Sequence, residues 1–429
     1  MPPSTPIPPS VTFPVWLKIA LLSFGGPAAQ IGVMQRLIVE EKGWLDQARF
    51  NHALNFCMML PGPEAQQLAT YIGWLLGGVR GGLVAGVVFV LPGALVMLAL
   101  SLLYVTVGDT GLANGLLFGL KCAVLAIVAQ ALLRMAGKVV TGVSGLVLSL
   151  LAFAAMFVFS LPFPLVILIA AGVGLVVYSG RSEPVDTGPA PAPVRWPVTL
   201  TTALLWLLPL VVLVLMTGTE SVWTRLAGFF SLMSVLSFGG AYAVLAWVAQ
   251  YAAEAQNWIT APEMLDGLGL AETTPGPLIL VTQFVGFLAA WRQEGMLHPL
   301  LAGSLGGMLT TWVMFAPSFL WIFLLAPQVE KLRGNPRIAG ALRGITAAVV
   351  GVIANLAVWF GLRLLFTETH QITWTRINLE LPVLTTLDPW ALGMVAAAAI
   401  LLFALRLGLF ATVGIMAAIG VALQVGGVV

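Results

Sequence analysis

A Pro-Gly-Pro motif interrupts two otherwise apolar stretches of the chain. The first copy, Pro61-Gly62-Pro63, precedes Gln66 and Gln67, and the second lies within Thr273-Thr274-Pro275-Gly276-Pro277. Proline has no backbone N–H and its ring clashes with the preceding turn, so each motif predicts the end of one helix and the start of another. The first amides of a helix lack intrahelical partners, and the helix dipole adds about half a positive charge there. The motifs therefore indicate anion binding.

A second motif also occurs twice, as Ser23-Phe24-Gly25-Gly26 and Ser237-Phe238-Gly239-Gly240. Together the motifs predict four helix starts, and we expect the amides of residues 62–65 and 276–278, with the two Gly-Gly turns, to cradle an anion. The neutral side chains of Gln66, Gln67, Thr273 and Thr274 are additional predicted donors. The alternative is that these residues only permit helix kinks and packing, which explains one motif more easily than four symmetric ones.

Two cationic side chains lie inside apolar segments, namely Lys121 and Arg343. Inserting a charged side chain at the centre of a membrane-spanning helix costs about 2.5–3.5 kcal/mol on insertion scales. We therefore take each of these two residues as a candidate for a functional role. We expect both to balance the charge of a bound anion. The alternative for each is a side chain that extends to the membrane interface.

Two carboxylates, Glu64 and Glu272, flank the two Pro-Gly-Pro motifs. An ionised carboxylate repels an anion, so these residues suggest that a proton is exchanged as the anion binds and leaves. This hypothesis couples transport to the proton gradient. The alternative for Glu64 is a structural carboxylate that stabilises a helix N-terminus.

The composition sets the protein class. The chain has 429 residues, of which 59% are hydrophobic and 8% charged, with a mean hydropathy of +1.01, so we expect a polytopic membrane protein surrounded by lipid. A net charge of +2 does not suggest nucleic acid as a partner. Two separate cysteines, three histidines and the lack of a phosphate-binding loop predict no metal, no cofactor and no enzymatic activity. Met1–Ser10 lacks the features of a signal peptide.

The apolar segments predict an all-α fold when judged against about 20 residues per membrane span. Segments of the first half are expected at residues 11–35, 48–78 (broken), 81–105, 114–135, 143–160 and 162–178. An additional span is expected at 197–216. Segments of the second half are expected at 222–250, 262–291 (broken), 297–325, 338–364, 389–405 and 408–425. Whether the first and the broken segments cross the membrane or re-enter stays open.

The two halves are repeats. Ser23 and Ser237, Trp44 and Trp258, and Gly62 and Gly276 are each 214 positions apart, and Pro92 and Pro317 are 225 apart. We therefore predict three parts, which are a repeat at 1–178, a linker with a connecting span at 179–220, and a repeat at 221–429.

Lys and Arg positions predict that the repeats are inverted. The loop with Arg36, Lys42 and Arg49 is basic, whereas its equivalent at 250–263 has no Lys or Arg. The loop at 106–113 has none, whereas its equivalent contains Lys331, Arg333 and Arg337. Because basic loops face the cytoplasm, equivalent loops face opposite sides, with the N-terminus cytoplasmic. Inverted repeats with paired broken helices are typical of secondary transporters.

Three sets of residues carry a resemblance to a known family. They are the paired Ser-Phe-Gly-Gly motifs, the segment Leu60-Pro61-Gly62-Pro63-Glu64-Ala65-Gln66-Gln67-Leu68-Ala69, and Thr273-Thr274-Pro275-Gly276-Pro277 followed by Phe284-Val285-Gly286. With these motifs the chain resembles the chromate ion transporter family in its long two-domain form. The resemblance covers nearly the whole chain. It implies efflux of chromate through a bacterial inner membrane, with sulfate as a competing oxyanion, and two homologous halves of opposite orientation.

Several alternatives stay open. They are a transporter of sulfate or another oxyanion, a passive anion channel, a membrane-bound metal-dependent reductase or protease, and a structural membrane scaffold. Saturable flux that responds to a gradient distinguishes a transporter from a channel. Assembly as a homodimer also stays open.

Overall fold

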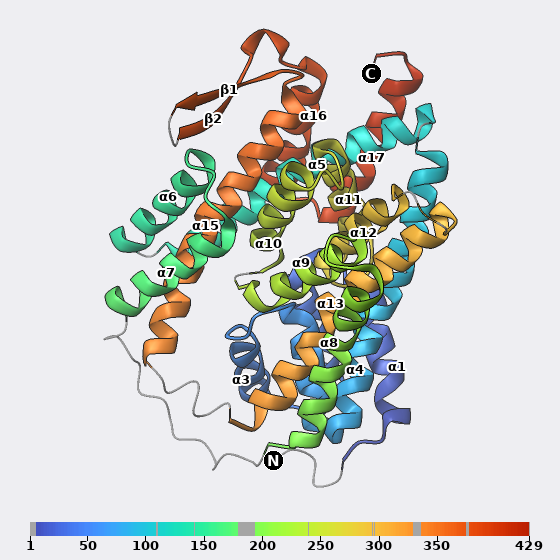
Figure 1. Ribbon diagram of the computed structural model, residues 1–429, viewed down its shortest axis with the longest axis vertical. Coiled ribbons are helices and arrows are strands. Elements are labelled where there is room, and N and C mark those ends of the chain that lie inside the picture. The colour runs from blue at the N-terminus through green and yellow to red at the C-terminus, as the bar shows by residue number, and fades with distance from the viewer. Residues whose placement is uncertain are drawn as a thin grey trace. The chain divides into compact units, whose positions relative to one another are not determined.

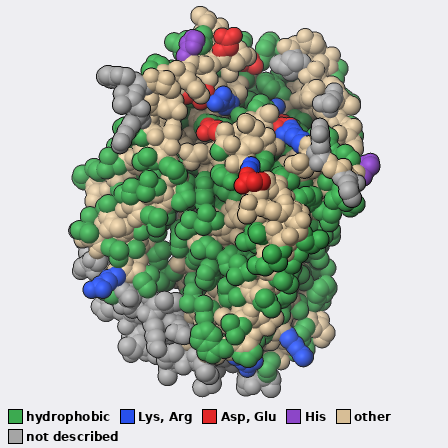
Figure 2. Space-filling view, in the orientation of Figure 1, with side chains coloured by type: hydrophobic (Ala, Val, Ile, Leu, Met, Phe, Trp, Pro, Cys, Tyr) green, Lys and Arg blue, Asp and Glu red, His purple; other side chains and the backbone are tan. Residues whose placement is uncertain are grey.

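The computed structural model describes residues 6–108, 110–140, 142–178, 194–238, 240–293, 295, 297–328, 336–374 and 377–428. The chain is mostly helical (Figure 1). Among the described residues, five helices are long and apolar enough to cross a membrane. They are α4 (Glu64–Val107), α5 (Gly111–Val139), α8 (Trp196–Thr217), α13 (Pro299–Leu325) and α15 (Pro336–Leu365). The chain is thus a multi-pass membrane protein, and hydrophobic side chains dominate the face shown in Figure 2.

The other described α-helices are shorter than the about 20 residues that a full span needs. They are α1 (Pro9–Leu22), α2 (Gly26–Gln35), α3 (Gln47–Cys57), α6 (Val143–Phe157), α7 (Phe163–Val177), α9 (Val222–Leu236), α10 (Ala241–Val248), α11 (Ala261–Thr273), α12 (Val281–Trp291), α16 (Pro389–Ala399) and α17 (Leu409–Val425). The expected segment at 11–35 is two helices, which are separated at Ser23 and Gly25. Within α4, Gly77 and Gly78 are non-helical, so this helix consists of two parts.

The chain forms two compact units. Unit 1 comprises Met1–Leu102, Glu183–Ala241 and Thr274–Asn335, and unit 2 comprises Leu103–Ser182, Tyr242–Thr273 and Pro336–Val429. Each unit contains segments from both sequence repeats. The division into 1–178, 179–220 and 221–429 is a division of the sequence and stays a prediction, and residues 179–193 of its linker lie outside the described residues.

Helix α13 is the central packing partner in unit 1. It lies against α8, α9 and α12. Its contact with α12 is close because glycines face each other there: a β-carbon built on Gly286 would lie 2.0 Å from Thr310 Oγ1, and one on Gly306 would lie 2.5 Å from the carbonyl oxygen of Gly286. Small residues let membrane helices approach closely.

Two similar glycine crossings hold unit 2 together. Helix α17 packs on α5, and α7 packs on α15 (Figure 1). A β-carbon built on Gly119 would lie 2.1 Å from the carbonyl oxygen of Met416, and one on Gly344 would lie 2.3 Å from that of Ala170. Gly119 and Gly344 are 225 positions apart, so the crossings occupy equivalent positions in the two repeats.

The backbone repeats its local conformation at the register that the motifs predict. Ser23 has φ −85° and ψ 84°, and Ser237 has φ −80° and ψ 85°. Gly43 (φ 59°) is matched by Asn257 (φ 51°). Two π-helical turns, η1 (Arg36–Glu41) and η2 (Ala249–Ala255), also lie at equivalent positions. The sequence alone did not predict these turns.

A β-hairpin departs from the all-α prediction. Strands β1 (Thr369–Trp374) and β2 (Ile377–Pro382) pair antiparallel, with Thr369 opposite Pro382. The segment Ile-Asn-Leu-Glu-Leu of β2 alternates apolar and polar residues, which favours a strand. Arg363 of α15 donates to Glu380 of β2 at 3.0 Å, so the hairpin is attached to this helix.

Candidate functional site

Unit 1 brings the four helix-break motifs together through two reciprocal hydrogen bonds. The amide of Gly62 donates to the carbonyl oxygen of Ser237 at 2.9 Å, and the amide of Gly276 donates to that of Ser23 at 2.6 Å. Each Pro-Gly-Pro motif is therefore bonded to the Ser-Phe-Gly-Gly motif of the other repeat. Both Gly62 (φ 124°) and Gly276 (φ 96°) have a backbone conformation that favours glycine.

These bonds decide which amides remain for a ligand. Because the amides of Gly62 and Gly276 already have protein partners, the backbone donors left at the first break are those of the first turn of α4. Its first intrahelical bond runs from the Gln67 amide to the Pro63 carbonyl oxygen at 3.0 Å. The preceding amides, of Glu64, Ala65 and Gln66, form no hydrogen bond within the described part of the chain, as is usual at a helix start.

Two glutamine side chains bind backbone carbonyl oxygens of the two Pro-Gly-Pro motifs. Gln67 donates through Nε2 to the Pro61 carbonyl oxygen at 2.6 Å, and Gln30 donates through Nε2 to the Gly276 carbonyl oxygen at 2.6 Å. Gln67, a predicted anion ligand, thus uses its amide group to hold the break. Gln30 was missed by sequence reasoning, although a glutamine in the apolar segment 11–35 is a usable signal.

Several buried polar atoms beside the breaks have no hydrogen-bond partner among the described residues. They include the hydroxyl oxygens of Ser23 and Ser318 and both polar side-chain atoms of Gln66. These three residues are at most 1% exposed. Leaving a buried polar group unpaired costs about 1–3 kcal/mol, so proteins rarely do it without a ligand or water at the site.

Ser318 is a site residue that the sequence analysis missed. Its hydroxyl oxygen lies 3.4 Å from the position of a β-carbon on Gly62. It follows Pro317, which matches Pro92 in the repeat register, so its equivalent is Gly93. A β-carbon on Gly93 would lie 2.1 Å from the carbonyl oxygen of Pro275, within the other break. The two breaks therefore share an architecture, but the first is lined by a hydroxyl and the second by a glycine.

The remaining motif residues are placed as follows. Gly25, Gly26 and Gly240 have positive φ and lie in unit 1. The same unit contains Pro61, Pro63, Thr274, Pro275 and Pro277. Thr274 is buried. Thr273 belongs to unit 2 and donates to the Leu270 carbonyl oxygen at 2.7 Å within its helix. Gly239 lies outside the described residues.

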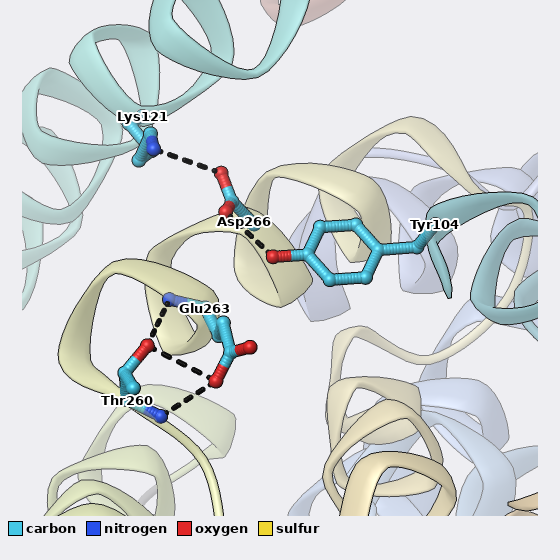
Figure 3. A network of polar contacts seen from close by, with 5 residues as sticks. All are labelled: Tyr104, Lys121, Thr260, Glu263 and Asp266. Carbon is cyan, nitrogen blue, oxygen red and sulfur yellow. Dashed lines mark hydrogen bonds and ion pairs between the residues drawn. The ribbon is translucent and has the colours of Figure 1, made fainter. Parts of the chain in front are cut away.

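Lys121 is located in unit 2, where it is ion-paired. Its Nζ lies 3.3 Å from Oδ1 of Asp266, and the hydroxyl of Tyr104 donates to Oδ2 of Asp266 at 3.0 Å (Figure 3). Asp266 is buried. Arg343, the other predicted cation, lies in unit 2 and is exposed on α15.

The two predicted coupling carboxylates differ in their surroundings. Glu64 is the first residue of α4 in unit 1. Glu272 is buried in unit 2, where its Oε1 accepts a hydrogen bond from the hydroxyl of Tyr242 at 2.6 Å. Its Oε2 has no hydrogen-bond partner among the described residues.

Sequence reasoning also missed Asp266, Tyr104 and Tyr242. Asp266 is an acidic residue within the broken apolar stretch 262–291, so the rule that singled out Lys121 applies equally to it. The two tyrosines have no comparable signal, because a tyrosine in an apolar helix is also an ordinary packing residue.

The comparisons with known proteins agree with the motifs. The family model for chromate transporters matches residues 11–175 and 223–422. The chain is 32% identical over 361 residues to the chromate transport protein of Pseudomonas aeruginosa, which covers 81% of this chain and 80% of that protein. It is 29% identical over 359 residues to the probable chromate transport protein of Synechococcus elongatus, covering 81% and 83%. No solved structure matches the chain. The resemblance inferred from the motifs is confirmed, and the chain belongs to the chromate transporter family.

Proposed function

We propose that the protein exports chromate or a related tetrahedral oxyanion by secondary active transport, and that the anion binds at the helix breaks of unit 1. The observation that carries the proposal is that buried side-chain donors of Ser23, Gln66 and Ser318, beside these breaks, have no partner in the part of the chain that the structure describes. A dianion that has lost its hydration shell needs several donors and positive potential. Free amides at a helix start supply both.

The transport cycle that we propose uses the repeat architecture. The two halves are inverted repeats, the N-terminus is cytoplasmic, and the protein lies in a bacterial inner membrane. Support comes from the opposite charge patterns of equivalent loops and from the reciprocal bonds of Gly62 and Gly276. In inverted-repeat transporters the substrate site lies where broken helices of the two repeats meet, and the repeats rock around it.

The direct test is chromate uptake into proteoliposomes that contain the purified chain, with pH gradients of both polarities and sulfate as competitor. Saturable flux that responds to the gradient is the expected result. Flux that is neither saturable nor dependent on the gradient would favour a passive anion channel, which the same helix starts also suit. Stronger competition by sulfate than by unlabelled chromate would make sulfate the preferred substrate.

Replacing Ser318 by alanine is expected to weaken chromate binding. A hydrogen bond to a charged group contributes about 1.5–3 kcal/mol, so the loss of this hydroxyl should raise the KM by about tenfold or more. The measurement is the concentration dependence of uptake. Ser304→Ala, in the same helix, is the matched control because that hydroxyl donates to the Leu300 carbonyl oxygen. An unchanged KM for Ser318→Ala would exclude this residue as a ligand.

Neutralising the carboxylates beside the breaks is expected to remove the dependence on protons. We propose that Glu64 and Glu272 exchange protons during the cycle, so Glu64→Gln or Glu272→Gln should leave chromate exchange intact but abolish accumulation driven by a pH gradient. Parallel assays of exchange and accumulation measure the two properties separately. Full gradient-driven accumulation in both variants would show that neither carboxylate takes part. The proposed anion site lies in unit 1, whereas Lys121 and Arg343 lie in unit 2, so their expected role in balancing the anion stays a prediction that this proposal does not use.

A further inference from the structure

The ion pair between Lys121 and Asp266 places two opposite charges inside apolar segments of unit 2. The side chain of Asp266 is 5% exposed and that of Lys121 is 21% exposed. The pair joins α5 to α11, and the Tyr104 hydroxyl adds a contact from the last turn of α4 (Figure 3). Among the described residues, Oδ1 of Asp266 has Lys121 Nζ as its ion-pair partner and forms no other hydrogen bond. It is therefore the oxygen that can accept a proton when Lys121 moves away.

A capping box holds the start of the helix that carries Asp266. The Thr260 amide donates to Oε2 of Glu263 at 2.7 Å, and the Glu263 amide donates to Oγ1 of Thr260 at 3.3 Å. Such reciprocal bonds stabilise a helix N-terminus. Asp266 follows one turn later and is thus positioned by a well-defined helix, as Figure 3 shows.

We propose that Asp266 binds and releases one of the protons that drive transport, and that Lys121 is the cation that replaces this proton. The inference rests on the proposed function and adds a carboxylate to the two at the helix breaks. In this proposal Asp266 is ionised while it is paired with Lys121, as in the conformation described here. When Lys121 withdraws, Oδ1 takes one proton from water and an O–H bond forms. When Lys121 returns, that bond breaks and the proton leaves to water, with no electrons transferred.

Lys121 is the cation that is paired with Asp266, and the other charged side chains described around α11 are placed as follows. Glu263, on the same helix, also acts electrostatically on Asp266. Glu272 of α11 accepts a hydrogen bond from Tyr242, and Arg134 lies on α5. On the elements packed against α11, Glu254 of η2 accepts from Trp359, and Arg363 of α15 binds Glu380. Arg343 of α15 is exposed.

The repeat register adds a further observation. The position equivalent to Asp266 in the first half, 214 residues earlier, is His52. Both halves therefore carry a titratable side chain at the same place, one acidic and one basic. A group that served packing alone would not need to be ionisable in both repeats.

The decisive variant neutralises both partners, as Lys121→Met with Asp266→Asn. A buried ion pair that only stabilises the fold is often replaceable by neutral residues, whereas removal of one partner leaves an uncompensated charge. We expect the single variants to give little folded protein and the double variant to recover the yield. In proteoliposomes the double variant should keep chromate–chromate exchange close to the wild-type rate but show no accumulation driven by a pH gradient. Glu263→Gln, which keeps the capping box, is the matched control and should retain both activities.

Two outcomes would overturn the inference. Gradient-driven accumulation in the double variant would make the pair structural, and loss of chromate exchange would instead assign Lys121 to the anion. A second measurement does not depend on flux: infrared difference spectra of the purified protein between acidic and alkaline pH should contain the C=O band of a protonated carboxylic acid that the double variant lacks. If the wild type carries no chromate the proposed function fails, and this band still decides whether Asp266 takes up a proton.

Discussion

Replacing Gly62 by leucine is expected to abolish chromate flux while the protein still inserts into the membrane. Gly62 has φ 124°, a conformation that costs a residue with a side chain about 1–3 kcal/mol. Its β-carbon would lie 2.6 Å from Nε2 of Gln67, the group that bonds to the Pro61 carbonyl oxygen. The side chain would therefore displace Gln67 and disturb the start of α4. Uptake into proteoliposomes should fall to the level of empty vesicles.

A second glycine with positive φ supplies the control for this experiment. Gly43 has φ 59°, and a β-carbon there would have no neighbour within 4 Å. Its equivalent in the second repeat is Asn257, so Gly43→Asn should retain transport. Gly276→Leu should behave like Gly62→Leu, because Gly276 also has positive φ and forms the reciprocal bond. Wild-type flux in both leucine variants would exclude the breaks as the anion site.

Replacing Gly174 by leucine is expected to prevent unit 2 from folding. A β-carbon at this position would lie 2.4 Å from the carbonyl oxygen of Gly340 and 2.9 Å from Cα of Gly344, so the two helices would have to separate. Overpacking of a tight core typically costs about 1–3 kcal/mol, and a clash with backbone has no flexible side chain to relieve it. Size-exclusion chromatography of the solubilised protein after heating should show a large loss of the folded peak.

The control lies two residues away on the same helix. Gly172 is exposed, and a β-carbon there meets no atom within 4 Å. Gly172→Leu adds the same side chain to α7 and should leave the folded peak unchanged. Equal stability of the two variants would mean that the crossing between α7 and α15 contributes little to the fold.

The sequence predicts those features that depend on one residue type at one position. The registers of 214 and 225 are visible because prolines and glycines are needed at helix breaks, and the backbone angles of Ser23 and Ser237 agree with this register. A third register of 246 relates α6 to α16 and α7 to α17, and Ser160 (φ 49°) to Arg406 (φ 51°). No motif marks it, because these helices share only their apolar character.

Features that depend on contacts between distant segments could not be predicted. The bond from the Gly62 amide to Ser237 requires two segments 175 residues apart to meet, and no local pattern reports this. Lys121 was recognised by its charge and the same rule applies to Asp266, but no local pattern reports that these two distant residues form a pair. The β-hairpin was missed because its alternating pattern is short and follows a long apolar helix.

The reciprocal bonds mean that neither repeat can complete its own helix break. A half-length polypeptide would leave one glycine amide and one serine carbonyl without partners until it met a complementary half. Joining two such halves in one gene fixes their ratio at one to one and removes the need for them to remain identical. The two halves can then diverge in sequence. An example is the position beside each helix break, which is Ser318 at the first break and Gly93 at the second, so that a hydroxyl is present at the first break only.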